Sequence, residues 1–424
     1  MKSGTLYGWG SANFGTLPVT GSAVDGKQDC IYPSPIVLPK GRGGTRFVSV
    51  SADMGRVFCA VDDTHGLWVW GGERSFVPST PTPVMQGVMD ACVNAKCCVA
   101  VGEGGRVFLV GPTTATPVAV EGIPEAAVSV AACGGSFLAV CGDGAVWASG
   151  EKLNNGLGED TVAPKRMTIP PVSYAALGSR SGAAITLEGN MWVWGDGLSG
   201  TLGLGARVVC PCPVECPQFR EMGLRVTSVA CTRGQHDPKR MGTKGGQEGP
   251  RTHVVTEDGV LWIAGTTHKG LGGDHLYKTM TPESDHLVFY KVGGKAADAS
   301  SSVVLTGAAE DLRDGTAIVA RRMGMASTSD FGRGGDTHYL EAVRVMHSQP
   351  CHIHSLALSD DGRLFTWGCG SDGRLGLRAY MRGPGGSKRT LKCYVSTPSV
   401  VEAFEDRNVV FATAGRYWSF AIVA

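Results

Sequence analysis

The sequence predicts an all-β fold, a β-propeller of four-stranded antiparallel blades that forms a single domain over residues 1–424. Three observations predict it. A short apolar strand motif recurs eight times, a glycine turn precedes each copy, and the chain begins and ends on strands that would complete one hairpin. Self-similarity of this kind is typical of repeat architectures.

The repeated motif is an apolar strand that closes on a small or indole side chain, usually followed by glycine. Its copies are Leu6–Gly10, Leu67–Gly71, Val107–Gly111, Val146–Gly150, Met191–Gly195, Leu261–Gly265, Ala317–Arg321 and Leu364–Gly368. The preceding turn glycines are Gly4, Gly66, Gly105, Gly144, Gly189, Gly259, Gly315 and Gly362. We therefore count eight hairpins, of which the copy at Val303–Arg321 is the weakest because it has a long turn and no Trp-Gly pair.

Three further strands complete each predicted blade. The second strand precedes the turn, as in Val57–Val61, Cys97–Val101, Phe137–Cys141, Ala183–Leu187, His253–Thr256, Val303–Thr306 and Ser355–Leu358. Upstream lies a first strand with period-two alternation, as in Phe47–Val50, Val128–Ala131, Val226–Cys231 and Val409–Ala414. A proline-led fourth run suits an outer edge strand, which has no neighbour to accept a ladder hydrogen bond. Examples are Pro35–Leu38, Pro83–Met85, Pro117–Val120, Pro213–Glu215 and Pro398–Val401.

The two ends of the chain predict how the ring closes. Thr5–Trp9 reads as a third strand without a partner before it, and Trp418–Val423 reads as a second strand without a partner after it. Pairing of the two would leave no open sheet edge.

Composition agrees with a body of short strands and tight turns. Glycine supplies 62 of the 424 residues, about twice the usual share. The net charge of +1 gives no overall attraction to nucleic acid or membrane. Cysteines such as Cys59, Cys98 and Cys141 lie in apolar runs, and Met1–Gly10 runs directly into a strand. We expect an intracellular protein of the cytoplasm or nucleus, with an organelle or cilium left open, and no membrane span.

Two segments quoted from the repeats resemble a known family. His354–Gly368 (HSLALSDDGRLFTWG) with Gly373–Leu377 (GRLGL), and Met191–Gly205 (MWVWGDGLSGTLGLG), are similar to the repeats of the regulator of chromosome condensation family of β-propellers. The resemblance covers essentially the whole chain and implies seven blades, one fewer than the hairpins counted.

Most residues that could carry chemistry have a structural interpretation. Trp9, Trp70, Trp194 and Trp367 are expected to pack between blades. Cys210, Cys212, Cys216, Cys231 and His236 contain zinc-ligand types, but the spacing differs from that of a zinc knuckle. His354 stands where the family resemblance places a structural histidine. We expect no catalytic residue, no bound metal and no cofactor.

Two long insertions carry the strongest functional signal. In an up-and-down blade, the loops after strands one and three emerge on the same side, and both insertions fall there. The candidate partner-binding residues are Arg233, Lys239, Arg240, Lys244 and Arg251 in the first, and Arg378, Arg382, Lys388, Arg389 and Lys392 in the second. The sequence therefore predicts one basic face that suits an acidic partner, although solvated loops without a partner would have the same composition.

The leading functional hypothesis is a non-enzymatic scaffold that docks protein partners, such as subunits of a larger complex, through this face. The family resemblance implies an alternative, a guanine-nucleotide exchange factor for the small GTPase Ran, although the acidic wedge-forming loop of that activity has no residue-by-residue counterpart here. A third hypothesis is an RNA- or ribonucleoprotein-binding module, which few aromatic residues near the basic loops support.

Overall fold

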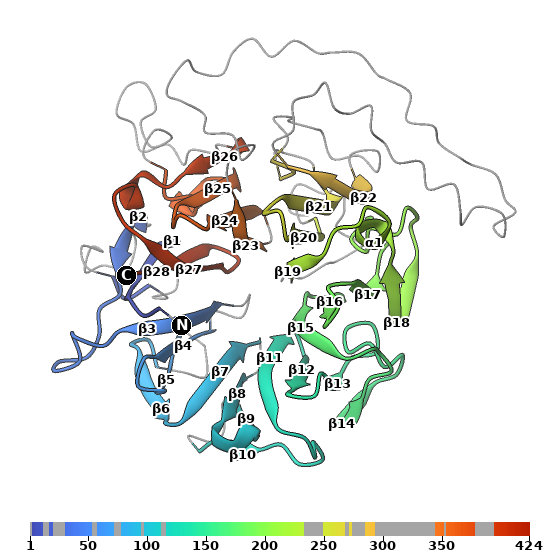
Figure 1. The fold of residues 1–424 in the computed structure, drawn as a ribbon. Helices are drawn as coiled ribbons and strands as arrows, with labels where there is room; N and C mark the ends of the chain where they lie inside the picture. The colour runs from blue at the N-terminus through green and yellow to red at the C-terminus, as the bar shows by residue number, and fades with distance from the viewer. Residues whose placement is uncertain are drawn as a thin grey trace, which may run out of the picture.

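The computed structural model describes residues 2–11, 17–19, 30–52, 57–71, 78–94, 97–111, 116–232, 249–267, 271–273, 285–292, 344–351, 353–377 and 394–424. These residues form seven four-stranded antiparallel sheets arranged as a ring (Figure 1). The predicted all-β propeller is thereby confirmed, with seven blades. The eighth motif, Ala317–Arg321, and the run Val303–Thr306 before it lie outside the described residues.

Blades 1 to 6 order their strands from the axis of the ring to the rim in chain order (Figure 1). Blade 1 contains β3 (Phe47–Ala52), β4 (Val57–Asp62), β5 (Leu67–Gly71) and β6 (Thr82–Met85); blade 2 contains β7 (Val88–Val93), β8 (Cys98–Gly102), β9 (Val107–Val110) and β10 (Val118–Ala119); blade 3 contains β11 (Ala127–Cys133), β12 (Ser136–Cys141), β13 (Val146–Gly150) and β14 (Thr161–Arg166); blade 4 contains β15 (Val172–Leu177), β16 (Ser181–Thr186), β17 (Met191–Asp196) and β18 (Val209–Cys216).

The remaining blades follow the same order. Blade 5 contains β19 (Val226–Cys231), β20 (Arg251–Thr256), β21 (Leu261–Thr266) and β22 (Asp285–Lys291), and blade 6 contains β23 (Val345–Pro350), β24 (His354–Ser359), β25 (Leu364–Cys369) and β26 (Tyr394–Val400). The short helix α1 (Gln218–Glu221) and the 3-10 turns Glu103–Gly105, Ser371–Gly373 and Glu402–Phe404 lie between strands.

Blade 7 is assembled from both ends of the chain, as predicted. It contains β27 (Val409–Ala414), β28 (Trp418–Val423), β1 (Thr5–Gly10) and β2 (Cys30–Pro35). β1 pairs with β28 from Thr5 opposite Val423 to Gly10 opposite Trp418. The first strands of successive blades contact one another around the whole ring, including β27 with β3, so the ring is closed.

Turn glycines connect several blades to the next blade. The N–H of Val172, the first residue of β15, donates to the carbonyl of Gly144 at 2.9 Å, and Val226 repeats this bond with Gly189 at 2.9 Å. Gly144 has a φ of +84°, and a Cβ there would lie 2.8 Å from Pro171. Only glycine combines this backbone conformation with so close an approach.

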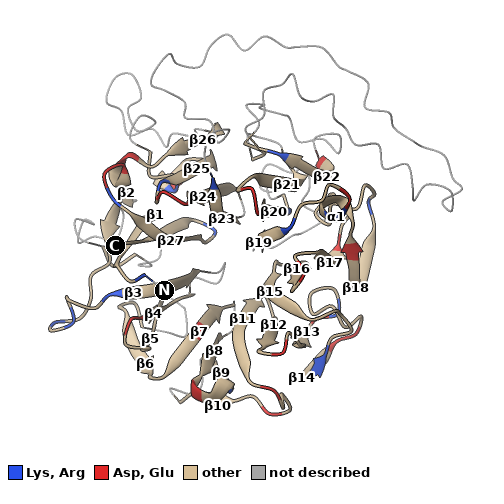
Figure 2. Ribbon diagram, in the orientation of Figure 1, with Lys and Arg blue, Asp and Glu red and all other residues tan. Residues whose placement is uncertain are grey.

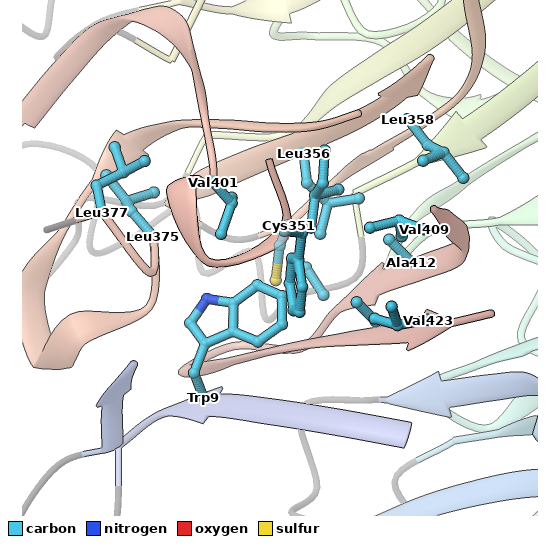
Figure 3. Packing of buried hydrophobic residues seen from close by; sticks show 14 of the residues in the cluster. Trp9, Cys351, Leu356, Leu358, Leu375, Leu377, Val401, Val409, Ala412 and Val423 are labelled. Atoms are coloured by element: carbon cyan, nitrogen blue, oxygen red, sulfur yellow. The ribbon is translucent and has the colours of Figure 1, made fainter. Parts of the chain in front are cut away.

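The predicted core role of the tryptophans is confirmed. Trp9, Trp70, Trp194 and Trp367 are fully buried. The indole Nε1 of Trp194 donates to the carbonyl of Asn154 in the preceding blade at 2.8 Å, and that of Trp9 donates to the carbonyl of Arg374 at 2.9 Å. Figure 3 shows Trp9 among Leu375, Leu377 and other apolar residues where blades 6 and 7 meet. The indoles of Trp194 and Trp9 thus tie their blades to the preceding blade.

Candidate macromolecular interface

The blade topology defines two sides of the ring. We call the side with the turns between second and third strands the hairpin side. We call the opposite side, where first strands lead into second strands and third into fourth, the insertion side. Residues 233–248 follow β19 and residues 378–393 follow β25, so both insertions leave neighbouring blades on the insertion side.

Nine of the ten predicted partner-binding cations lie outside the described residues. They are Arg233, Lys239, Arg240 and Lys244 of the first insertion and Arg378, Arg382, Lys388, Arg389 and Lys392 of the second. The described residues that flank them are Thr232 and Gly249 at the base of the first insertion, and Leu377 and Tyr394 at the base of the second.

The tenth cation, Arg251, is not on the surface, and its assignment to the exposed basic face is wrong. Arg251 is the first residue of β20, opposite Gly265, and its side chain is fully buried. Its Nη2 donates to the carbonyl oxygens of Cys351 at 2.5 Å and His354 at 2.9 Å, and to Ser355 Oγ at 3.2 Å. Nη1 donates to the carbonyl of Gly249 at 3.1 Å. Burial among these carbonyls makes Arg251 a structural residue that joins blades 5 and 6.

The guanidinium of Arg251 stays charged although it is buried. Burial lowers its pKa to about 10, which leaves the group protonated at neutral pH. The four oxygen atoms that accept its hydrogen bonds supply the partial negative charge that water would otherwise provide. Arg251 therefore fixes the base of the first insertion, at Gly249, to blade 6.

His354 forms the corresponding link between blades 6 and 7. Its Nε2 lies 2.9 Å from Ser419 Oγ, and Ser419 Oγ donates to the carbonyl of Arg374 at 2.9 Å. Because the hydroxyl proton is used in that bond, Ser419 accepts from His354, which places a proton on Nε2. The structural role expected for His354 is confirmed by its complete burial.

A second histidine supports the boundary between blades 5 and 6. His253 Nδ1 lies 2.8 Å from Ser348 Oγ, and its ring stacks on Trp367 with an interplanar angle of 2°. Burial, followed by the positive charge of Arg251, lowers the pKa of His253 well below its ordinary value. His253 is thus neutral at physiological pH and has no solvent access for acid–base work.

Sequence reasoning missed two further arginines on the insertion side. Arg374 is almost fully buried and pairs with Asp372, and its guanidinium lies 5.2 Å from the ring centroid of Tyr417. Arg416 lies over the same ring at 5.0 Å. Figure 2 shows such charged residues near strand ends and outer strands, while the inner parts of the blades are largely uncharged. The one available signal was that Arg374 occupies the variable position of the G-x-L-G-L motif, Gly373–Leu377.

Within the described residues, the side chains of zinc-ligand type do not gather into a site. Cys210, Cys212 and Cys216 all belong to the outer strand β18, where Cys212 is exposed and Cys216 is buried. Burial raises the pKa of Cys216 to about 12, which disfavours the thiolate that zinc requires. Among the described residues there is no group of three or more His, Cys, Asp and Glu side chains arranged to hold a metal ion. His236 lies outside them.

Among the residues that the structure describes, no helix is both long and apolar enough to cross a membrane. A closed ring of seven four-stranded blades, joined by buried polar side chains such as Arg251 and His354, defines the class of β-propellers.

Comparison with known proteins shows which repeats and which proteins this chain resembles. A sequence profile described as "Regulator of chromosome condensation (RCC1) repeat" matches residues 188–234 and 361–422. The chain is 27% identical over 389 residues to the human E3 ubiquitin-protein ligase HERC2, covering 88% of this chain and 7% of HERC2. It is 26% identical over 291 residues to the mitochondrial RCC1 domain-containing protein RUG3 of Arabidopsis thaliana, covering 57% of this chain and 60% of that protein.

Two solved structures share the whole fold. Prp20p of Saccharomyces cerevisiae superposes with a TM-score of 0.71 at 16% identity, over 100% of this chain and 92% of Prp20p. Human WBSCR16 superposes with a TM-score of 0.66 at 14% identity, over 100% of this chain and 99% of that chain. The chain is therefore similar to the RCC1-family β-propellers in the repeats that the profile matches and in its fold.

Proposed function

We propose that this propeller is a non-catalytic docking scaffold that recruits an acidic protein surface through the two basic insertions on its insertion side. One observation carries the proposal: the bases of both insertions belong to neighbouring blades, 5 and 6, which Arg251 joins through buried hydrogen bonds. Both insertions are rich in Lys and Arg. They therefore leave the same side of the ring from two neighbouring blades that buried hydrogen bonds hold together.

The composition of the insertions supports an acidic partner. Residues 378–393 contain five cations and no acidic residue, and residues 233–248 contain four cations against two acids. Because the whole chain has a net charge of +1, these segments concentrate positive charge locally. Such patches accelerate encounter with an acidic surface and make binding sensitive to salt.

A charge-reversal experiment tests the proposal. The variant Arg382→Glu, Lys388→Glu, Arg389→Glu is compared with Lys40→Glu, Arg42→Glu, Arg106→Glu, whose three exposed cations lie on the hairpin side. Both variants change the net charge equally. We expect the salt concentration that elutes the protein from immobilised polyglutamate to fall only for the first variant. Equal behaviour of the two variants would show that only net charge matters, and the proposal would fail.

Nucleic acid is tested with the same variants. Double-stranded DNA and single-stranded RNA replace polyglutamate at equal total charge. Tighter binding of either nucleic acid, lost in the insertion variant, would replace the acidic protein with a nucleic-acid backbone as the partner.

Guanine-nucleotide exchange remains the alternative that the family suggests. The structure of Prp20p is described together with its binding to Gsp1p and histones. This chain is 16% identical to Prp20p, so the likeness between the two proteins shows a shared fold alone. Release of labelled GDP from a Ran-type GTPase, measured with and without this chain, distinguishes the two functions. The scaffold proposal expects the release rate to be unchanged.

A further inference from the structure

Two histidines lie beside the buried Arg251 at the boundary between blades 5 and 6. β19 and β20 of blade 5 contact β23 of blade 6 there (Figure 1). His253 belongs to β20, and His347 belongs to β23. Within the described residues, every buried basic side chain belongs to blade 5 or blade 6; these residues are Arg251, His253, His354 and Arg374. Buried basic groups are therefore concentrated in one part of the ring.

The hydrogen bonds of His253 leave no acceptor for a second proton on its ring. Ser348 Oγ donates to the carbonyl of Leu356 at 2.8 Å, so it accepts from Nδ1 of His253, which lies 2.8 Å away. Nε2 of His253 is buried and has no hydrogen-bond partner in the part of the chain that the structure describes. The parallel indole of Trp367 covers one face of the ring. A proton on Nε2 would therefore create a buried cation whose new N–H lacks an acceptor, which is costly.

His347 has a similar environment on the facing strand. Its Nδ1 lies 3.2 Å from Ser228 Oγ in β19, and its ring centroid lies 6.3 Å from that of Phe411 in blade 7. Burial lowers the pKa of His347 to about 4. Burial, followed by the positive charges of Arg251 and of protonated His347, lowers the pKa of His253 well below its ordinary value. Both imidazoles are therefore neutral at physiological pH while the boundary is closed.

No carboxylate compensates a positive charge at this boundary among the described residues. Arg251, His253 and His347 form no ion pair with any of them. The titratable groups that face Arg251 from other strands are the thiol of Cys351 and the hydroxyl of Tyr290. Protonation of both histidines would place three positive charges within one boundary, so repulsion adds to the cost of burial.

We infer that the boundary between blades 5 and 6 opens locally when His253 and His347 take up protons, while the boundaries between blades 1 to 4 stay closed. The open form solvates both imidazolium groups, so acid favours it. Arg251, at this boundary, bonds to Gly249 and to Thr232 at the base of the first insertion. Release of the acidic partner by acid is a consequence that rests on the proposed function, whereas the opening itself does not.

Hydrogen–deuterium exchange of the full chain, without any partner, tests the inference. Exchange rates at pH 6 and pH 5 are corrected for the intrinsic pH dependence of amide exchange. Histidines with an ordinary pKa near 6.5 in the open form take up protons over this range and raise the open population. We expect exchange of peptides from β19, β20 and β23 to rise at least tenfold, and that of peptides from β7, β11 and β15 to change less than twofold. A uniform rise in all blades, or no rise at β19, β20 and β23, would overturn the inference.

Variants separate the titration from a merely weak boundary. His253→Leu introduces the residue that blade 6 has at the equivalent position, Leu356, and His347→Ser introduces the residue that blade 5 has, Ser228. The double variant is expected to abolish the rise, and His347→Ser alone to reduce it at least threefold. The control His65→Asn removes an exposed histidine from the turn of blade 1 and should leave the rise unchanged.

A rise that persists in the double variant would contradict titration of these histidines. Should the double variant not fold, equal rises in His347→Ser and in the unmodified chain would overturn the inference instead. Because no polyanion is present in these measurements, their outcome does not depend on whether the insertions recruit an acidic partner.

Discussion

Nη2 of Arg251 donates a hydrogen bond to the carbonyl oxygen of His354 across the boundary between blades 5 and 6, at 2.9 Å. The two residues occupy equivalent places, since each begins a second strand opposite the glycine that ends the third-strand motif, Gly265 and Gly368. Each of them bonds to the next blade. The seam from blade 5 to blade 7 is therefore built from repeated polar links, which explains how it supports two long insertions.

Replacing Arg251 with methionine should destabilise the ring. The carbonyls of Cys351, His354 and Gly249 would lose a charged donor, whereas removal of the buried charge offsets part of that cost. We expect a net loss of about 2 kcal/mol in the free energy of unfolding, measured by urea denaturation. Arg106→Met, at an exposed turn, should change stability by less than about 0.5 kcal/mol. A similar effect of the two changes would contradict the buried link.

Trp194→Phe tests the indole contact between blades 3 and 4. The change removes the Nε1 donor to the carbonyl of Asn154 and leaves that buried oxygen without this hydrogen bond. The expected cost is about 2 kcal/mol, from the unsatisfied carbonyl and the smaller ring. Thermal unfolding measures it. An unchanged midpoint would show that Trp194 does not tie the two blades together.

Ring closure is tested at Gly4. A Cβ at this position would lie 2.2 Å from the carbonyl oxygen of Val423, so Gly4→Ala must displace β28 or β1. We expect a loss of at least about 2 kcal/mol, seen as a lower denaturation midpoint. Gly44→Ala is the matched control, because a Cβ there meets nothing within 4 Å. If both variants unfold alike, closure through β1 and β28 does not limit stability.

The pH dependence of stability has a defined sign at His347. Burial lowers its folded pKa to about 4, below the ordinary value near 6.5, so the unfolded chain binds more protons between these two values. His347 therefore contributes stability that is full above about pH 6.5 and is lost as pH falls toward 4. Urea midpoints measured between pH 4 and 7 should vary less steeply in His347→Gln. A steeper dependence in that variant would contradict the sign.

Much of the fold follows from the sequence because its pattern repeats. β19, β27 and β28 begin and end at the predicted residues, and Thr5–Gly10 extends the predicted Thr5–Trp9 by one residue. Turn glycines and tryptophans could be interpreted locally, since each satisfies a contact that recurs in several blades.

Arg251 was missed for a physical reason. A cation at the end of a basic loop is usually solvated, and the carbonyls that bury this one come from residues about a hundred positions later in the chain. A signal was nevertheless present: Arg251 stands eight residues before the turn glycine Gly259, as His354 stands eight before Gly362.

Hydrogen–deuterium exchange in the presence of polyglutamate tests the docking side most directly. We expect slower exchange of peptides that contain residues 233–248 and 378–393, with unchanged exchange at the hairpin turns around Gly66, Gly144 and Gly259. Protection confined to the hairpin side, or no protection at saturating polyglutamate, would contradict recruitment through the insertions.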